Sequence, residues 1–395
     1  ANARSLDPRP ITARGAGTGT NGQSLTDGLI VDTKRRMGAI GHFDPEARTI
    51  EVEPGVVAAR LDEFLRPHGL FWPPETSTVT RCTIGGMIAT DAAGQGSLRY
   101  GRTSRHVVAL DVVLDDGSRW DAHPIPVDEA ERRAARNGRE AKIWRALLDV
   151  PDRDFRLPEL ARGFSGYGLD RVRRDDPELG PVIDPIPVLC GSEGTLGITV
   201  GATLALTPIP DHRVLVVAAY NSFDDALDDS LRLRDSAPTS IETIDETTLG
   251  RGRASTAWEV VGDLLAPDGG GGSVLLIEYA GNEGDTVAPD VTEVEALIRS
   301  GGRATRVTIV DDPSERAAAW RVRADAVGIL AKVAPGAPQP TAFVEDCAVP
   351  VASMPAFIEG FRQILDAHGL TYGMFGHADV GCVHVRPALD LIEPE

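Results

Sequence analysis

The chain has 395 residues, of which 42% are hydrophobic, so it is long enough for two or three globular domains. Its formal net charge of −19 argues against nucleic-acid binding, because phosphates would be repelled. No apolar run approaches the roughly 18 residues that span a bilayer, and no signal-peptide pattern opens the sequence. We therefore expect a cytoplasmic protein without a transmembrane segment, and peripheral membrane attachment stays open.

The cysteines are scattered along the chain, and none stands in a CxxC pair. This spacing argues against a zinc ribbon, an iron–sulfur loop or a disulfide framework within these residues. We expect free thiols, most of them buried, at Cys82, Cys190, Cys347 and Cys382.

A glycine-rich stretch at residues 14–24 has four glycines within eight residues. No bulky side chain shields its backbone N–H groups, and such a run of N–H dipoles suits an anionic diphosphate. A solvated turn is the alternative, since Gly-Thr-Asn-Gly is also ordinary turn chemistry. A buried strand at 28–32 follows without an intervening helix. The loop is therefore a poor match to a Rossmann site, whose glycines open a helix, and Asp32 is not assigned to a ribose.

The next elements lead to a second segment of small residues. Thr49–Val52 alternates like a strand, and a helix near 57–67 is expected to stop at Gly69. Residues 82–97 then combine paired glycines with two isoleucines, which suggests backbone packed close to a flat ligand. Tight helix packing through small residues is the alternative.

The remainder of the first half contains a third glycine-rich element. A strand at 107–114 turns at an Asp-Gly pair, and residues 128–148 predict one surface helix. Residues 188–198 then place Glu193 among glycines, where it is either a hydrogen-bond acceptor for a ligand or a solvated loop acid. The stiff sequence at 207–210 suits a domain boundary.

The second half alternates strands with amphipathic helices, which predicts a single sheet with helices packed on it, an α+β or ferredoxin-like cap. Ser353 is expected to cap a helix that ends at Gly369. The expected strands are 214–220, 274–279, 305–310 and 342–344, and the other expected helices are 223–234, 291–299 and 315–327.

Two histidines stand in the closing segment, which has alternating apolar residues from 375 to 385. The residues between His377 and His384 suggest a tight turn, so both imidazoles could come from adjoining strands and hold a divalent metal. Structural histidines are the alternative, and a third ligand would have to come from elsewhere. Arg323 and Arg386 are candidates for binding a substrate carboxylate bidentately, or else ordinary ion-pairing arginines.

Together the three glycine-rich segments resemble the FAD-binding domain of the vanillyl-alcohol oxidase/p-cresol methylhydroxylase (PCMH) superfamily. Residues 14–24 resemble its pyrophosphate loop, 82–97 its second flavin segment and 191–198 its GSEGTLG signature. The second half resembles its FAD-linked oxidase cap. Within the superfamily the chain is most similar to the bacterial D-2-hydroxyglutarate dehydrogenases of the large form, with a C-terminal iron–sulfur domain. The supporting residues are 74–77, 343–346 and 376–390.

The resemblance implies an α+β fold with two domains. These are a PCMH-type FAD-binding domain at 1–210 and a ferredoxin-like FAD-linked oxidase cap, the substrate domain, at 211–395. We also expect both domains to be incomplete. In the family, a first strand–helix portion precedes Ala1, and a Glu-His pair that supplies a metal ligand and the general base follows Glu395.

The resemblance further implies noncovalent FAD, because Thr18 stands where relatives with covalent flavin often have a histidine. The residues implied to bind the cofactor are Arg14, Gly15, Ala16, Gly17, Thr18, Gly19, Asn21, Gly22, Gln23, Ser24, Glu75, Thr76, Ser77, Gly85, Gly86, Thr90, Asp91, Gly94, Ser97, Glu193, Gly194, Gly197 and Ile198.

The implied activity is oxidation of a D-2-hydroxy acid by hydride transfer to flavin N5, with D-2-hydroxyglutarate preferred and D-lactate or glycolate next. The implied catalytic residues are Arg323, which follows Trp320 in a W-x-x-R pattern, Arg386 and His384. His377 and His384 would hold zinc or a similar ion, which would polarise the substrate's 2-hydroxyl and lower its pKa.

Two features depart from the family pattern. Many relatives read H-x-G-D-G-N-x-H where residues 378–382 are ADVGC, and a substrate-contacting Asn of relatives is replaced by Arg386, so the substrate's identity stays open. The alternatives are an oxidase of the same superfamily, reoxidised by dioxygen, and a noncatalytic FAD-binding electron-transfer subunit. An iron–sulfur cluster would lie outside this segment, and the electron acceptor and any homo-oligomer are left open.

Overall fold

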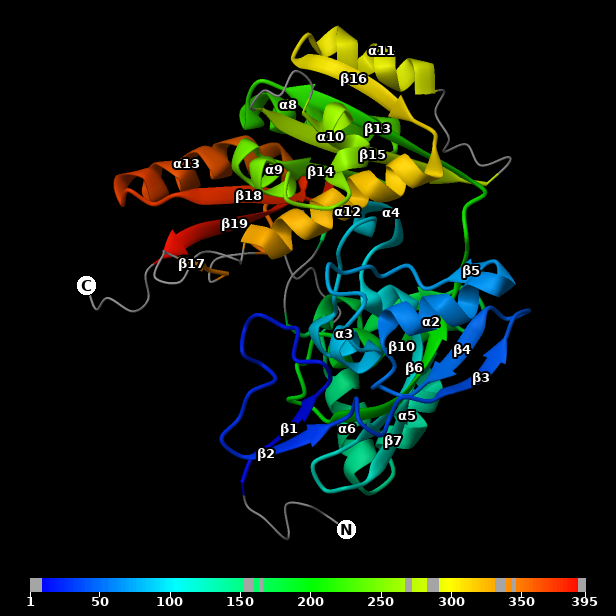
Figure 1. The fold of residues 1–395 in the computed structure, drawn as a ribbon. Helices are drawn as coiled ribbons and strands as arrows, with labels where there is room; N and C mark the ends of the chain where they lie inside the picture. The colour runs from blue at the N-terminus through cyan, green and yellow to red at the C-terminus, as the bar shows by residue number, and fades with distance from the viewer. Residues whose placement is uncertain are drawn as a thin grey trace. The chain divides into compact units, whose positions relative to one another are not determined.

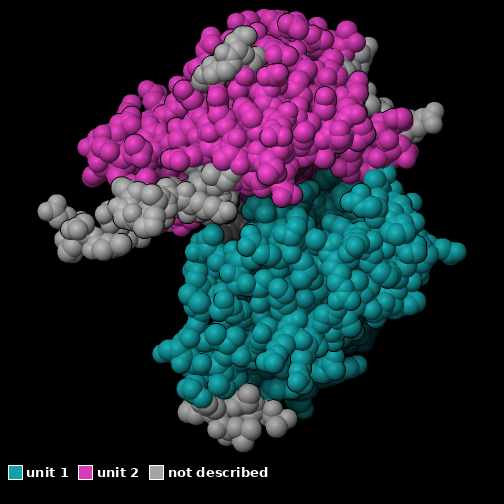
Figure 2. Space-filling view, viewed as in Figure 1, with its two compact units in different colours: residues 1–94, 100–157, 164–209 teal, residues 95–99, 158–163, 210–395 magenta. Residues whose placement is uncertain are grey.

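The computed structural model describes residues 9–151, 160–162, 166–266, 272–282, 291–330, 339–342 and 346–389. The chain forms two compact units, which Figure 2 shows in different colours. Unit 1 comprises Ala1–Gly94, Tyr100–Leu157 and Phe164–Ile209, and unit 2 comprises Gln95–Arg99, Pro158–Gly163 and Pro210–Glu395. Unit 2 thus includes two short pieces from the first half of the chain, which the sequence pattern does not predict.

Unit 1 is built around a five-stranded antiparallel sheet with the strand order β3-β4-β11-β6-β7. The central strand β11 is the direct continuation of the third glycine-rich element. The strands are β3 (Ile40–Asp44), β4 (Thr49–Val52), β6 (Val107–Val113), β7 (Arg119–Ala122) and β11 (Ile198–Ala205).

Three small sheets complete unit 1. Strands β1 (Ile11–Arg14) and β2 (Leu29–Asp32) pair in parallel, and the glycine-rich loop that joins them contains no helix, as expected. The others pair β5 (Leu70–Phe71) with β12 (Thr207–Pro208), and β10 (Gly180–Ile183) with both β8 (Ile125–Pro126) and β9 (Arg173–Asp176).

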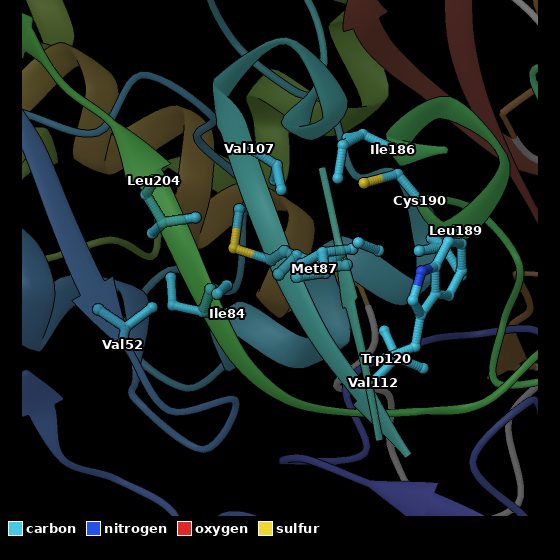
Figure 3. Close-up of a cluster of buried hydrophobic side chains, with 14 of the residues drawn as sticks. Val52, Ile84, Met87, Val107, Val112, Trp120, Ile186, Leu189, Cys190 and Leu204 are labelled. Carbon is cyan, nitrogen blue, oxygen red and sulfur yellow. The ribbon is translucent and has the colours of Figure 1, made fainter. Parts of the chain in front are cut away.

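Apolar side chains from the sheet and from the helices of unit 1 share one core (Figure 3). Helix α2 buries Leu61 and Leu65, and α3 buries Ile84 and Met87. The predicted helix stop at Gly69 is confirmed, because Gly69 has the left-handed φ of 67°. The helices here are α2 (Ala58–Leu65), α3 (Ile84–Thr90), α5 (Val127–Ala134), α6 (Arg139–Leu148) and α7 (Ile186–Leu189), and α4 (Ser97–Tyr100) crosses from one unit's residues to the other's.

The prediction of a single surface helix at 128–148 is wrong. The chain breaks into α5 and α6 at Gly138, whose φ of 112° is not helical. Trp144 is fully buried and packs edge-on against Trp120, with 5.8 Å between ring centroids. The mixed charge of this segment is typical of a surface helix, but α6 contributes Trp144 to the core.

Unit 2 is a seven-stranded sheet with the order β16-β13-β15-β14-β18-β19-β17, which confirms the predicted single sheet. All its pairings are antiparallel. Its strands are β13 (His212–Tyr220), β14 (Ser240–Ile244), β15 (Ser273–Gly281), β16 (Ala304–Val310), β17 (Gln339–Pro340), β18 (Tyr372–His377) and β19 (Cys382–Leu389).

Helices cover both faces of this sheet (Figure 1). One face packs on α8 (Phe223–Leu233), α11 (Val291–Gly301) and α13 (Met354–Ala367) through a core that includes Ile241 and Ile277. The opposite face packs on α9 (Glu246–Gly252), α10 (Trp258–Leu265) and α12 (Pro313–Leu330) through a core that includes Ile244 and Leu276. We call the second face the α12 face.

Several local predictions for unit 2 can be judged directly. Helix α13 ends before Gly369, which has the left-handed φ of 64° as expected. Ser353 stands at the N-cap position of α13 as expected, but its side chain makes no capping hydrogen bond. The strand expected at 342–344 lies largely outside the described residues.

All four cysteines are free, and three of them are buried. Within the described part of the chain, no helix is both long and apolar enough to cross a membrane.

We predict that Leu110→Ala lowers the free energy of unfolding by about 2–5 kcal/mol, because Leu110 is 1% exposed in the core of unit 1. Val108→Ala is the matched control, since Val108 lies on the same strand and is 40% exposed. It should change stability by less than about 0.5 kcal/mol. Urea denaturation followed by tryptophan fluorescence measures both, and equal losses would contradict this description of the core.

Candidate functional site

The glycine-rich loop at 14–24 packs against the start of helix α3. A Cβ atom on Gly15 would collide with Oγ1 of Thr83, so the loop backbone lies directly against that side chain. Gly17 and Gly22 have φ angles of 66° and 76°, which glycine adopts without strain. The first and second glycine-rich segments therefore form one continuous region of unit 1.

The two adjacent glycines of α3 have different surroundings. A Cβ on Gly85 would lie 2.5 Å from Cβ of Pro54, so Gly85 permits close packing of the helix. A Cβ on Gly86 would meet only Oγ1 of Thr83, at 3.4 Å, and Gly86 is exposed. The packing interpretation of this segment therefore applies to Gly85, while Gly86 leaves room for a ligand.

The third glycine-rich element lies against the C-terminal end of α3 in the folded chain. The backbone N–H groups of Gly191 and Glu193 donate to the carbonyl oxygens of Ile88 and Ala89, at 3.0 and 2.8 Å. Glu193 is exposed and has an uncommon positive φ of 49°. A Cβ on Gly197 would lie 2.5 Å from Cγ1 of Val112, so Gly197 allows β11 to pack closely against β6.

The three segments, far apart in sequence, thus meet in one region of unit 1, and this region fits an elongated anionic cofactor such as FAD. Gly22 and Gly194 have open space where a Cβ would stand. The buried Oε1 of Gln23 has no hydrogen-bond partner among the described residues. Exposed glycine backbone and an unsatisfied polar atom are features that a diphosphate-containing ligand would complete.

Asp91 has a structural role in this region. Its buried carboxylate forms an ion pair with Arg102 at 3.0 Å and approaches Arg171 at 3.6 Å. It also accepts hydrogen bonds from the backbone N–H and the hydroxyl of Ser104. These contacts explain how the carboxylate of Asp91 can be buried in the absence of a ligand. Any contact between Asp91 and a cofactor stays a prediction.

The other predicted cofactor residues differ in exposure. The Thr90 hydroxyl donates to the carbonyl oxygen of Gly86 in its own helix, at 3.1 Å. Gly94 packs against the backbone of Glu75, and Ser97 belongs to the short piece that clusters with unit 2. The exposed members are Gly17, Gly19, Asn21, Gly22, Glu75, Ser77, Gly86, Thr90, Glu193 and Gly194. The half-buried members are Arg14, Gly15, Ala16, Thr18, Gln23, Ser24, Thr76, Gly85, Gly197 and Ile198.

In unit 2, strand register brings the predicted histidines together. Glu242 on β14 pairs with His377 on β18, while His384 and Arg386 on β19 pair with Phe375 and Gly373. Directly paired residues share a face of the sheet, and residues two apart on one strand do so as well. All these side chains therefore lie on the α12 face.

A buried carboxylate connects two of the predicted site residues. Oε2 of Glu242 accepts hydrogen bonds from Nε and Nη2 of Arg323, at 3.0 and 2.6 Å. Oε1 of Glu242 lies 2.5 Å from Nδ1 of His377. Glu242 has no exposed surface, and Arg323 is only 8% exposed. Arg323 therefore forms an ion pair within a buried cluster, and its binding of a substrate carboxylate stays a prediction.

The charge states in this cluster follow from burial and from the ion pair. Burial opposes ionisation of Glu242, but Arg323 and His377 outweigh it and lower the pKa of Glu242 to about 2. Burial lowers the pKa of His377, so this imidazole is neutral. A neutral His377 beside a carboxylate donates its Nδ1–H to Glu242 and keeps its Nε2 lone pair.

His384 lies beside His377, with 5.4 Å between the ring centroids. Burial, together with His377, lowers the pKa of His384 to about 3, so this imidazole is neutral too. Asp346, Cys382 and His384 offer possible ligand atoms within 4.8 Å of one another, a group that the sequence reasoning missed. Burial raises the pKa of Cys382 to about 12, and Nη1 of Arg162 donates to its sulfur at 3.0 Å.

The two predicted arginines meet at one aromatic ring. The guanidinium carbon of Arg323 lies 5.5 Å from the ring centroid of Phe375, and that of Arg386 lies 6.0 Å from it. Such stacking orients a guanidinium and holds its plane. Arg323 and Arg386 are thus neighbours, although 62 residues separate them in the sequence.

Sequence reasoning missed Glu242 because it predicted no strand at 240–244. The pattern Ser-Ile-Glu-Thr-Ile alternates and is rich in β-branched residues, which is a strand signal. Every residue of β14 is buried, and a buried acid requires partners. Asp379 was missed as well: its Oδ2 accepts from the backbone N–H of Ile241 at 3.1 Å and ties the histidine turn to β14.

Two family models match the chain. The FAD binding domain matches residues 4–122, and the C-terminal domain of FAD linked oxidases matches residues 209–395. A D-2-hydroxyglutarate dehydrogenase from Pantoea ananatis is 40% identical over 97% of this chain, and one from Escherichia coli K12 is 38% identical over 98%. The chain spans only 38% and 39% of the length of these two relatives.

More distant relatives agree with this grouping. Glycolate oxidase subunit GlcD of Bacillus subtilis is 28% identical over 97% of this chain and 68% of its own length. A solved structure of alkyldihydroxyacetonephosphate synthase superposes with a TM-score of 0.63 at 16% identity, covering 99% of this chain and 68% of that one. That likeness concerns the fold alone. The matches confirm the predicted superfamily and the predicted fold class.

We predict opposite effects of two neighbouring substitutions in α3. Gly85→Ala should destabilise the protein, because the new methyl group meets Pro54. Gly86→Ala should leave thermal stability unchanged or raise it, because alanine favours helix, while FAD affinity falls about tenfold or more through steric conflict. Thermal melting and FAD titration of the cofactor-stripped protein measure these effects, and unchanged FAD affinity in Gly86→Ala would refute the assignment of Gly86.

Proposed function

This chain belongs to the FAD-linked oxidases, and from that premise we propose that it oxidises a D-2-hydroxy acid to the corresponding 2-oxo acid. D-2-hydroxyglutarate is the preferred substrate, and D-lactate or glycolate come next. The observation that carries the proposal is the buried cluster of Arg323, Glu242 and His377 beside His384. Identity of 38–40% to D-2-hydroxyglutarate dehydrogenases over nearly the whole chain supports it.

FAD is held noncovalently by the three glycine-rich segments of unit 1. When bound, it accepts the hydride that leaves C2 of the substrate, while the hydroxyl loses its proton. The chain's own contribution is to bind the diphosphate through backbone N–H groups of residues 14–24 and to leave room for a flat ring at Gly86.

The substrate carboxylates are bound by the two arginines on the α12 face. Nε and Nη2 of Arg323 are occupied by Glu242, and among the described residues no acceptor occupies Nη1, which is left for a carboxylate. Arg386 stacks on the same Phe375 ring and is close enough to take part. Two neighbouring arginines suit a dicarboxylate better than a monocarboxylate, which favours D-2-hydroxyglutarate over D-lactate.

A divalent ion such as zinc binds at the histidine pair. His377 and His384 are neutral imidazoles, the form that ligates metals, and Asp346 and Cys382 are further donors near His384. The ion would polarise the 2-hydroxyl of the substrate. Asp346, Cys382 and His384 offer a mixed O, S and N donor set, which suits zinc better than magnesium or calcium.

We expect D-2-hydroxyglutarate, added without oxygen to the purified FAD-loaded chain, to bleach the flavin absorption at roughly 450 nm, because hydride transfer reduces the ring. L-2-hydroxyglutarate is the control. Persistent oxidised flavin would support the noncatalytic alternative. With air present, the dehydrogenase proposal requires turnover with an artificial acceptor and little hydrogen peroxide, whereas stoichiometric peroxide would identify an oxidase.

Arg323→Ala should weaken substrate binding by about 2 kcal/mol or more, which is roughly a 30-fold rise in KM, because a charge-assisted contact to the carboxylate is lost. Arg321→Ala is the matched control on the same helix, since Arg321 is exposed and pairs with Asp325. FAD content must stay intact in both variants. A KM within threefold of the wild type in Arg323→Ala would exclude this role.

A further inference from the structure

The two oxygen atoms of Glu242 serve two different groups of the proposed site. Oε2 holds Arg323 through two nitrogens, and Oε1 contacts Nδ1 of His377. Arg323 comes from helix α12, and His377 comes from strand β18. Glu242 is therefore the point at which a helix and a strand of the site are joined.

The contact with His377 decides which nitrogen that ring presents. A carboxylate at Nδ1 holds the proton there, so the Nε2 lone pair is available. Histidines that ligate metals usually donate their other ring N–H to a carboxylate, a carbonyl or water in this way. The observed distance of 2.5 Å gives His377 the same arrangement.

The contact with Arg323 decides which part of the guanidinium is available. With Nε and Nη2 on one carboxylate oxygen and Phe375 beneath the plane, the orientation of the group is set before any substrate arrives. A preorganised side chain loses less conformational entropy on binding. Among the described residues, the remaining nitrogen, Nη1, has no hydrogen-bond acceptor.

Glu242 is itself held firmly. It pairs directly with His377 across two hydrogen-bonded strands, and every residue of β14 is buried. The neighbouring N–H of Ile241 donates to Asp379, which lies in the 3₁₀ turn η7 (Ala378–Val380) between β18 and β19. The strand that carries Glu242 is thus fixed to the turn that joins the two histidine strands.

We propose that Glu242 is a positioning residue that aligns Arg323 for the substrate carboxylate and fixes His377 in the Nδ1–H tautomer for metal binding. This inference rests on the proposed function of the cluster. Glu242 touches neither substrate nor metal, and it acts through its two partners.

The decisive variant is Glu242→Gln, which has the same shape but no charge. Its amide oxygen will face the cationic Arg323, so its NH₂ group will face Nδ1 of His377. Nδ1 must then accept a hydrogen bond, and the proton moves to Nε2, the nitrogen that was available to a metal. Glu278→Gln is the matched control, because Glu278 is another buried acid on the α12 face, on the neighbouring strand β15.

Nitrogen-15 NMR of histidine-labelled full chain reads the tautomer, with the His377 signal identified by its loss in His377→Gln. We expect Nδ1–H in the wild type and in Glu278→Gln, and Nε2–H in Glu242→Gln. Zinc affinity, measured by elemental analysis after equilibration in zinc buffers, should fall about 10- to 100-fold in Glu242→Gln only. KM for D-2-hydroxyglutarate should rise at least tenfold in the same variant.

The outcomes separate this proposal from the proposed function. Nε2–H at His377 in the wild type overturns the positioning role even if Glu242→Gln fails to fold. So does a Glu242→Gln variant that keeps both the Nδ1–H tautomer and wild-type zinc affinity. If the wild type leaves D-2-hydroxyglutarate unoxidised, the proposed substrate is wrong, while the tautomer and zinc measurements still decide the role of Glu242.

Discussion

The polar cluster of unit 2 depends on one buried charge, the carboxylate of Glu242. Taking an ion out of water costs several kcal/mol, and removing one partner of a buried pair typically costs about 3–5 kcal/mol. Arg323 and His377 therefore stabilise the buried charge of Glu242, and Glu242 in turn orients both side chains. The result is a cluster in which Arg323, a candidate substrate-binding residue, and His377, a candidate metal ligand, share the carboxylate of Glu242.

The sheet of unit 2 makes this arrangement possible because the α12 face has two kinds of surface. Where α9, α10 and α12 cover the sheet, most of its residues on this face are apolar and form a core. Nearer β18 and β19, the same face presents His377, His384 and Arg386. Helix α12 contributes to both parts: Val322 packs in the core, and the next residue, Arg323, contacts Glu242.

In unit 1, glycine has two distinct uses within the same motifs. Gly85 and Gly197 lie where a side chain would strike Pro54 or Val112, so they serve packing. Gly22 and Gly194 have open space instead. A glycine-rich motif could therefore be recognised from the sequence, but its structural and ligand-facing members could not be separated there, because the atoms that distinguish them come from distant parts of the chain.

The sequence by itself determined the superfamily and many of the local elements, although it missed β14 and the break between α5 and α6. Alternation and helical periodicity are local, and they correctly indicated the helix-free loop before β2 and the hairpin that brings His377 and His384 together. Tertiary structure decided which side chains are buried and which distant residues contact one another, because local sequence patterns hold neither kind of information. Burial of Trp144 and the partners of Glu242 depend on residues far away, since the contacts of Glu242 span 81 and 135 positions. Only folding brings such residues within hydrogen-bonding distance, and burial then obliges their charges to pair.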